Sequence, residues 1–280
     1  MKHTFMTIIG LLSLLLTSCF EQSTVIKVNK DGTGIIHTRS YQNTGAVGGL
    51  GAMFGGGGEE AADSAAPDLP SDEELQSIAQ EMGEGVSVQS VKQSTNKAGW
   101  PGHEAIYAFT DISKVKIPLD TQMDQTGIDT EEVPAEASNI TFGQQGDVLS
   151  IFVPFISKAD EEVAATAPAE ASENPFGDTA AGGLDSMMSM MGMMGPMFKG
   201  ARMGVFVQID GELVATNAKH SKGQLITILN ADIGKLLSDP KALTDLKGIE
   251  APTREEAQAI ADKLDGITAD FTEEIKVKIR

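Results

Sequence analysis

The sequence predicts an α+β fold: a mainly antiparallel sheet built of hairpins, with a few packed helices and long low-complexity loops. Segments that alternate apolar and polar residues come in neighbouring pairs joined by short turns, which is typical of local hairpins. Segments with helical periodicity do not alternate with them in a βαβ rhythm. We expect one α+β domain over residues 19–280, with strands from both ends of the chain in its sheet. Two separate sheets divided at residues 157–183 are the alternative.

The hairpins are indicated by their turns. Residues 24–30 and 35–41 flank an Asp31-Gly32 pair, and Asp-Gly between alternating runs is a strong hairpin pattern. Residues 203–229 are expected to form a three-stranded meander. The other expected strands are 86–94, 103–110, 139–142, 148–155 and 272–279.

The helices are indicated by their N-terminal caps. Ser71 with Glu74, and Thr253 with Glu256, have the spacing of a capping box. They predict helices that end near Gly83 and Gly266. Two short helices are expected at 232–237 and 239–246.

Three stretches rich in small, acidic and Pro residues are expected to be flexible insertions: 42–70, 118–138 and 157–183. Between Ser40 and Val91 there are nine acidic residues and no Lys or Arg. Such stretches bury too little apolar area to offset the entropy of an ordered backbone.

Residues 1–18 are expected to be a cleaved signal peptide. Lys2 gives a positive start, and Ile8 to Leu16 form an apolar segment that is too short to remain as a membrane helix. The sequence Leu16-Thr17-Ser18-Cys19 that follows looks like the lipobox of bacterial lipoproteins, in which the cysteine thiol takes a diacylglyceryl group. An ordinary signal peptide with an incidental cysteine is the alternative.

Cys19 is the only cysteine. Its lipidation leaves the mature chain without a thiol for a disulfide, a zinc site or catalysis. The expected partner is a membrane, to which the diacylglyceryl group on this cysteine anchors the protein. Each CH₂ group of an acyl chain that is buried in the bilayer contributes about 0.8 kcal/mol to membrane binding. Residue 20 is Phe rather than the Asp typical of inner-membrane retention, which favours the periplasmic face of the outer membrane. A Gram-positive cell surface is the alternative.

The formal net charge is −19. This excess of acids argues against nucleic acid as a partner, and against electrostatic docking of the whole domain on anionic lipids.

The segment "SMMSMMGMMGPM" is the most unusual of the chain. If it is helical, its apolar arc covers roughly 220°, more than the 100° or so that a helix resting on a sheet needs. We considered a helix packed in the core, an adaptable surface for a partner protein or lipid, a Cu(I) site of thioether ligands and scavenging of oxidants. The candidate binding residues are Met187, Met188, Met190, Met191, Met193, Met194 and Met197.

No catalytic motif of the hydrolase, zinc-protease or nucleotide-binding type occurs. His37, His103 and His220 have no partner at the spacing of metal ligands. We therefore expect no enzyme activity, no cofactor and no metal site of the common kinds.

Residues 19–117 resemble LppM-type bacterial lipoprotein domains. The resemblance rests on "VNKDGTG" after the lipidated cysteine, a capped helix, "GVSVQSV" and "GWPGHEAIYAFTDI". Residues 196–238 look like a segment that recurs in bacterial lipoproteins. The resemblance implies an antiparallel α+β domain with an apolar ligand groove, and it supplies no catalytic residues.

These observations predict a membrane-anchored bacterial lipoprotein with a non-catalytic binding or structural role in the cell envelope. The alternatives are a Met-rich Cu(I)-binding periplasmic protein and a carrier of an apolar or lipid ligand.

Overall fold

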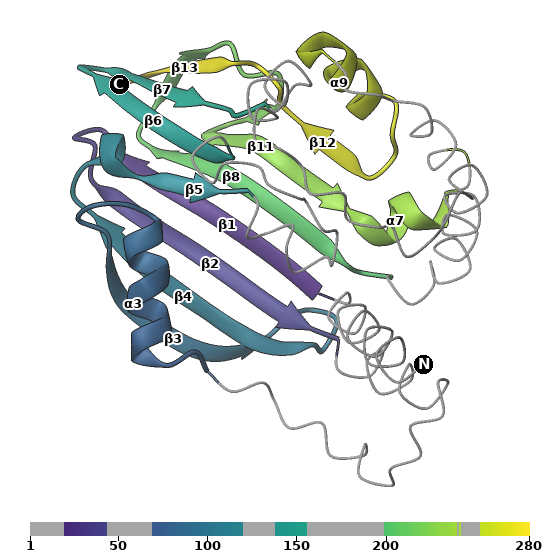
Figure 1. Ribbon diagram of the computed structural model, residues 1–280. Coiled ribbons are helices and arrows are strands. Elements are labelled where there is room, and N and C mark those ends of the chain that lie inside the picture. The colour runs from purple at the N-terminus through teal and green to yellow at the C-terminus, as the bar shows by residue number, and fades with distance from the viewer. Residues whose placement is uncertain (1–19, 44–68, 120–137, 156–198, 240, 242–252) are drawn as a thin grey trace, which may run out of the picture.

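The computed structural model describes residues 20–43, 69–119, 138–155, 199–239, 241 and 253–280. Their strands form two sheets, a large one and a small one, with helices beside them (Figure 1). Almost all neighbouring strands are antiparallel, which confirms the predicted α+β class with a mainly antiparallel sheet.

The large sheet has eight strands. In spatial order they are β10 (Ser221–Lys222), β11 (Leu225–Asp232), β8 (Arg202–Asp210), β1 (Phe20–Asn29), β2 (Gly34–Gln42), β4 (Pro101–Phe109) and β3 (Ser87–Thr95), with β12 (Ile267–Ala269) paired to β11 off this path. The small sheet runs β5 (Lys116–Pro118), β6 (Asn139–Gln145), β7 (Val148–Phe152), β13 (Glu274–Ile279) and β9 (Leu213–Thr216).

Each sheet contains strands from before and after residues 156–198, so the chain is not divided into two sheets at that segment. In the large sheet, β1 pairs with β8, and in the small sheet β7 pairs with β13. The predicted insertions 42–70, 118–138 and 157–183 lie almost wholly outside the described residues.

The predicted hairpin at Asp31-Gly32 is confirmed. Gly32 has a φ of 83°, a left-handed conformation that glycine adopts without steric cost. The Asp31 carboxylate accepts hydrogen bonds from the backbone N–H and the hydroxyl of Thr33, which lower the pKa of Asp31. The turn is therefore specified by its own four residues.

The pairing of β1 with β8 is parallel, unlike that of every other pair of described strands, and the sequence did not predict it. Glu21 lies opposite Arg202, and the register continues to Asn29 opposite Asp210. Parallel neighbours need a long crossover, here the whole chain between Asn29 and Arg202.

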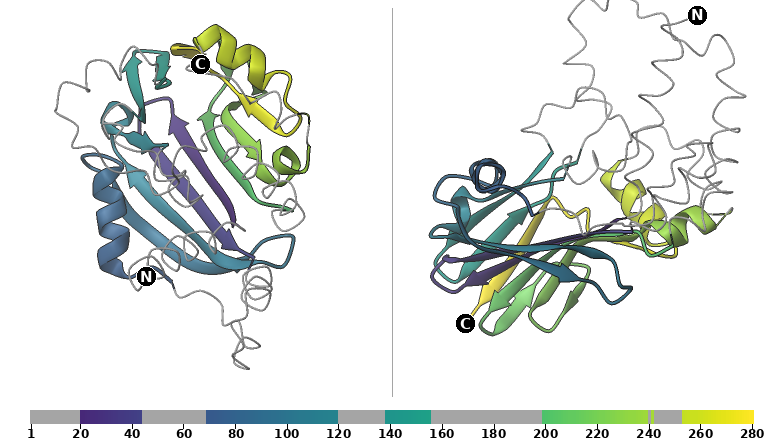
Figure 2. Two further views of the ribbon diagram at one scale, coloured as in Figure 1. Left: turned by 45° about the vertical axis from the view of Figure 1, so that its right-hand side comes forward. Right: turned by 90° about the horizontal axis from the view of Figure 1, so that it is seen from below.

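The main core lies between the two sheets. Along β4, Ala105, Tyr107 and Phe109 are buried, while the alternate residues Glu104 and Ile106 are only partly covered. One face of the large sheet therefore packs against the small sheet and helix α3, and the other face is more accessible (Figure 2). Ile275, Val277 and Ile279 of β13 enter the same core, as their alternation predicted.

Both predicted capping boxes are present. Ser71 and Glu74 begin α3 (Asp72–Glu81), which buries Leu75 and Ala79, and Thr253 and Glu256 begin α9 (Arg254–Ala261). The remaining described helices are the 3-10 turn η2 (Ile112–Lys114) and the short α7 (Ile233–Ser238). The helix expected at 239–246 lies almost wholly outside the described residues.

The meander predicted for residues 203–229 is wrong in one respect. Strands β8 and β11 pair, but β9 between them belongs to the small sheet, where it pairs with β13. Gly211, at a φ of 150°, redirects the chain, and Glu212 then exchanges backbone hydrogen bonds with Arg280. The sequence Leu-Val-Ala-Thr of residues 213–216 is compatible with a strand but does not indicate which sheet the strand joins.

Candidate functional site

The candidate lipidation and binding residues indicated by the sequence fall outside the described ones. They are Cys19 and the methionine-rich set Met187, Met188, Met190, Met191, Met193, Met194 and Met197. The Cu(I) and partner interpretations of that segment therefore stay predictions. Their positions along the chain are still informative, since Phe20 begins β1 and Lys199 leads into β8.

The starts of β1 and β8 lie side by side at one end of the large sheet, which we call the Phe20 end (Figure 1). The parallel register begins with Glu21 opposite Arg202. Cys19 is the residue bonded to Phe20, the first residue of β1.

The hairpin between β3 and β4 extends past the same end. Thr95 pairs with Pro101, and the register through β2 aligns this pair with Gln42 and Phe20. Residues 96–100 thus lie beyond the last row of the sheet. We call them the hairpin tip.

The hairpin tip is built around Asn96. The Asn96 side-chain oxygen accepts hydrogen bonds from the backbone N–H groups of Ala98 and Trp100, at 2.9 and 2.8 Å. Its amide nitrogen donates to Glu21 Oε2 at 2.7 Å, which ties the tip to the start of β1.

Trp100 reaches across to the start of β8. A Cβ atom at Gly200 would lie 2.8 Å from Trp100 Cη2, so the indole ring packs directly over the glycine backbone. Gly200 also has a φ of 93°. The sole tryptophan of the chain is therefore half-buried at the Phe20 end, between the hairpin tip and β8.

A small apolar cluster lies at this end, apart from the main core. Phe20, Met203 and Ala231 are buried in it, and Leu229, Ile233 and Ile267 pack around them in part. Met203, the methionine that follows the methionine-rich segment, is thus a core residue.

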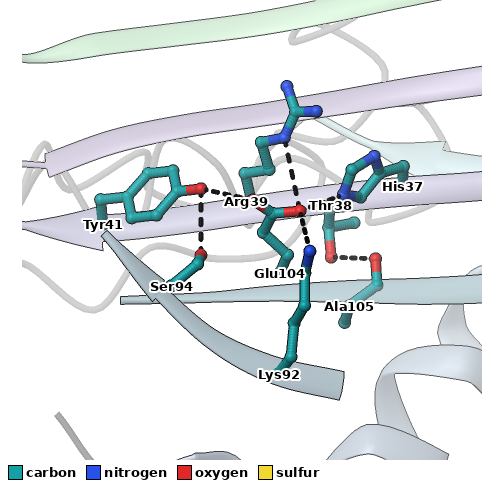
Figure 3. A network of polar contacts seen from close by, with 8 residues as sticks. All are labelled: His37, Thr38, Arg39, Tyr41, Lys92, Ser94, Glu104 and Ala105. Atoms are coloured by element: carbon teal, nitrogen blue, oxygen red, sulfur yellow. Dashed lines mark hydrogen bonds and ion pairs between the residues drawn. The ribbon is translucent and has the colours of Figure 1, made fainter. Parts of the chain in front are cut away.

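On the accessible face of the large sheet, Glu104 gathers a polar cluster from three adjacent strands (Figure 3). Its Oε1 accepts a hydrogen bond from the Tyr41 hydroxyl at 2.9 Å. Its Oε2 lies 3.0 Å from His37 Nε2, 3.4 Å from Lys92 Nζ and 3.9 Å from Arg39 Nε. The Ser94 hydroxyl donates in turn to the Tyr41 oxygen at 3.1 Å.

The cluster stabilises the charged form of Glu104. Partial burial raises the pKa of Glu104, but the hydrogen bonds from Tyr41, His37 and Lys92 outweigh it, and the net pKa is lowered. Burial, together with the neighbouring carboxylate, raises the pKa of Tyr41 despite the Ser94 hydrogen bond. Both groups keep their ordinary charge near neutral pH.

This arrangement is poorly suited to acid–base catalysis. A general base works best when its pKa lies near the working pH, whereas the pKa of Glu104 is lowered from its ordinary value. Arg39 and Lys92 together outnumber the carboxylate, so the cluster has a local positive excess in an acidic protein.

Sequence reasoning missed this cluster. His37, Arg39 and Tyr41 alternate along β2, which indicates a shared face. The register that sets Arg39 opposite Glu104, and Glu104 opposite Lys92, follows only from the fold.

The other two histidines stand apart. His103 is half-buried on β4, and burial lowers its pKa. His220 Nε2 lies 4.0 Å from Asp262 Oδ1. Within the described residues, no group of three or more His, Cys, Asp or Glu side chains is placed to hold a metal ion.

Among the depressions on the described surface, two have volumes of about 350 and 300 Å³. Both are lined by a mixture of polar and apolar groups. Glu81, Glu84, Lys114 and Lys116 contribute to the first, and Lys27, Asn29 and Gln89 to the second. Neither has the mostly apolar lining typical of a lipid pocket, so neither supports the carrier alternative.

None of the described helices has the length and apolar character needed to cross a membrane. No protein-family model matches the sequence, and no curated protein matches it. Among solved structures, the fold is similar to the NMR structure of the folded domain of LppM from Mycobacterium tuberculosis, with 10% identity and a TM-score of 0.30. The match covers 75% of this chain and 80% of that one. It is a match to the lipoprotein type that residues 19–117 resemble.

Proposed function

We propose that this protein is a lipid-anchored bacterial envelope protein with a non-catalytic binding or structural role. The observation that supports this most is the position of Cys19. It follows a signal-peptide pattern and directly precedes Phe20, which is 3% exposed and is the first residue of β1. A diacylglyceryl group on Cys19 attaches the sheet itself to the membrane without a flexible spacer.

The absence of a spacer bears on the kind of role. A long flexible linker after the lipidated cysteine lets a domain sample a wide volume. Here the sheet begins at the residue after the anchor, which suits a protein that presents a fixed surface near the membrane. The Glu104 cluster lies on the accessible face of that sheet, and the methionine-rich segment, which joins β8 at the Phe20 end, is the proposed contact for a protein or lipid partner.

The proposed location is the periplasmic face of the outer membrane, based on Phe rather than Asp after the cysteine. Phe20 also packs in the small apolar cluster, so an apolar residue at this position serves the fold as well. Density-gradient separation of inner and outer membranes tests the location, and recovery with the inner membrane would contradict it.

Substitution of Cys19 tests the anchor. Cells expressing the wild type, Cys19→Ser or the matched control Ser18→Ala are labelled with an alkyne fatty acid, and their membranes are floated on a density gradient. The wild type and Ser18→Ala, which keeps a small residue before the cysteine, should be labelled and float. Cys19→Ser should be unlabelled and absent from the floating fraction. If it floats without label, the protein is held by another means and the proposal fails.

A further inference from the structure

We propose that the hairpin tip, residues 96–100, makes a second contact with the bilayer in which Trp100 lies at the level of the lipid headgroups. The inference rests on the proposed lipidation of Cys19. It adds an orientation: the large sheet stands with its Phe20 end on the membrane and its Gly32 turn directed away.

The first step is geometric. A lipidated Cys19 is bonded to Phe20, and Phe20 lies in the last row of the sheet with Gln42, Pro101 and Thr95. The hairpin tip extends beyond that row on the same side as Cys19. A bilayer that receives the acyl chains therefore meets the hairpin tip at its surface.

The second step is the chemistry of the hairpin tip. Trp is favoured at membrane interfaces because its ring is apolar while its N–H remains near water. Trp100 is joined in the tip by Lys97, Ala98 and Gly99, which are all exposed. A lysine beside a tryptophan suits the headgroup region, where its ammonium group meets phosphate.

The third step is rigidity. The three hydrogen bonds of the Asn96 side chain fix the tip and tie it to Glu21, next to the anchor position. The ring of Trp100 packs over Gly200. A preformed tip loses little conformational entropy when it meets a surface.

Charge at this end also differs from the rest of the chain. Lys97 and Lys199 are exposed there, Arg202 is paired with Asp232 at 3.1 Å, and Glu21 accepts a hydrogen bond from Asn96. These three cations and two anions leave a small positive excess in a chain whose net charge is −19. The acidic remainder is repelled by anionic headgroups, which favours contact through this end over contact through a face of the sheet. The bilayer bearing the anchor is thus the partner that both position and charge fit.

The test uses the sole tryptophan as a depth probe. The full lipidated protein is reconstituted in vesicles of phosphatidylethanolamine and phosphatidylglycerol, with or without lipids brominated near the headgroup. Flotation first establishes that the protein is vesicle-bound. We expect brominated lipids to quench the Trp100 emission about twofold, and iodide in the buffer to quench it less in vesicles than in detergent.

The matched control moves the probe to the opposite end of the sheet. The double variant Trp100→Phe, Lys30→Trp has its only tryptophan beside the Asp31-Gly32 turn, at an exposed position. Circular dichroism checks that it folds. Its emission should be unaffected by brominated lipids.

The outcomes separate the two proposals. Protein that floats, with Trp100 quenched by iodide but not by brominated lipids, keeps the anchor and overturns the contact. Equal bromolipid quenching at positions 100 and 30 overturns the upright orientation. Lipidated protein that fails to float overturns the proposed function itself, and with it this inference.

Discussion

The two ends of the large sheet are built differently. At the Gly32 end, β1 turns into β2 at Gly32 and β8 leads into the small sheet at Gly211, both glycines having positive φ, and the strands there contribute to the main core between the sheets. At the Phe20 end, β1, β2 and β8 lead to residues outside the described ones, and the apolar cluster has three buried members among the residues that the structure describes. Polar side chains join the strands there, through Asn96 with Glu21 and Arg202 with Asp232.

Side-chain polar contacts occur at both ends, since Lys27 Nζ lies 3.5 Å from Asp210 Oδ2 near the Gly32 turn. What distinguishes the two ends is the size of the apolar core that the described residues form there. The Gly32 end should therefore be the more sensitive of the two to a loss of buried volume. A bilayer at the Phe20 end would add contacts where the described residues form the smaller of their two apolar clusters.

The largest difference is expected between Ile209→Ala and Met203→Ala, two inward-facing residues of β8. Ile209 is 0% exposed in the main core and Met203 is 5% exposed in the small cluster. Ile209→Ala should lower the free energy of unfolding by about 3 kcal/mol, because the surrounding core cannot collapse onto the cavity. Met203→Ala should cost about half as much. Chemical denaturation measures both, and equal or reversed costs would contradict the comparison.

Two glycines with nearly equal φ values, one at each end of the large sheet, provide a second comparison of the two ends. Gly32 at the turn and Gly99 in the hairpin tip have φ values of 83° and 85°. A Cβ at Gly32 would meet Gln144 Oε1 at 2.7 Å, whereas a Cβ at Gly99 meets nothing within 4 Å. Gly99→Ala should cost about 1 kcal/mol of backbone strain and Gly32→Ala measurably more. Thermal unfolding that ranks Gly99→Ala as the worse variant would show that the hairpin tip is packed more tightly than the structure indicates.

Asn96→Ala tests the polar link at the Phe20 end. The substitution removes two acceptor contacts within the hairpin tip and the donor contact to Glu21. We expect a loss of about 1 kcal/mol of stability, together with a change in Trp100 emission. Ser90→Ala, on the exposed edge strand β3, serves as the control. If Asn96→Ala leaves both stability and emission as in the wild type, the tip is held by other contacts.

The smallest effect is expected at Glu104. Its lowered pKa means that the carboxylate stabilises the fold above the unfolded-state pKa, which is about 4.3, and that this contribution is lost as the pH falls through the lower folded-state value. Glu104→Gln should therefore cost about 1 kcal/mol at pH 7, and its difference from the wild type should shrink below pH 4 or so. A difference that is unchanged from pH 7 to acid would rule out the charged cluster as its source.

The parts of this fold that the sequence predicted are those determined by interactions between residues close together in the chain. The Asp31-Gly32 turn, the Ser71 and Thr253 capping boxes and the alternation of β13 each depend on neighbouring residues. The parallel pairing of β1 with β8 was not predicted, because its two strands lie far apart in the chain and no turn joins them. The assignment of β9 to the small sheet failed for the same reason.

The features of the candidate site also differ in whether they depend on neighbouring residues or on residues far apart in the chain. The lipobox pattern around Cys19 is local, so the sequence alone indicated the anchor position. The Glu104 cluster and the contact of Trp100 with Gly200 depend on registers between distant strands, and no spacing in the sequence reveals them.

The orientation of the sheet on the membrane is the central claim, and energy transfer from two labelled positions tests it most directly. Lipidation of Cys19 leaves no other cysteine, so Ala98→Cys and Lys30→Cys each provide a single site for a donor dye, with acceptor dyes on the lipid headgroups of the vesicle. β1 has 10 residues, which at about 3.3 Å per residue separates the two ends by roughly 30 Å. The measured distance to the headgroup acceptors should be short for the dye at position 98. For the dye at position 30 it should be about 30 Å longer. Equal distances, or a shorter distance at position 30, would contradict a sheet that stands on its Phe20 end.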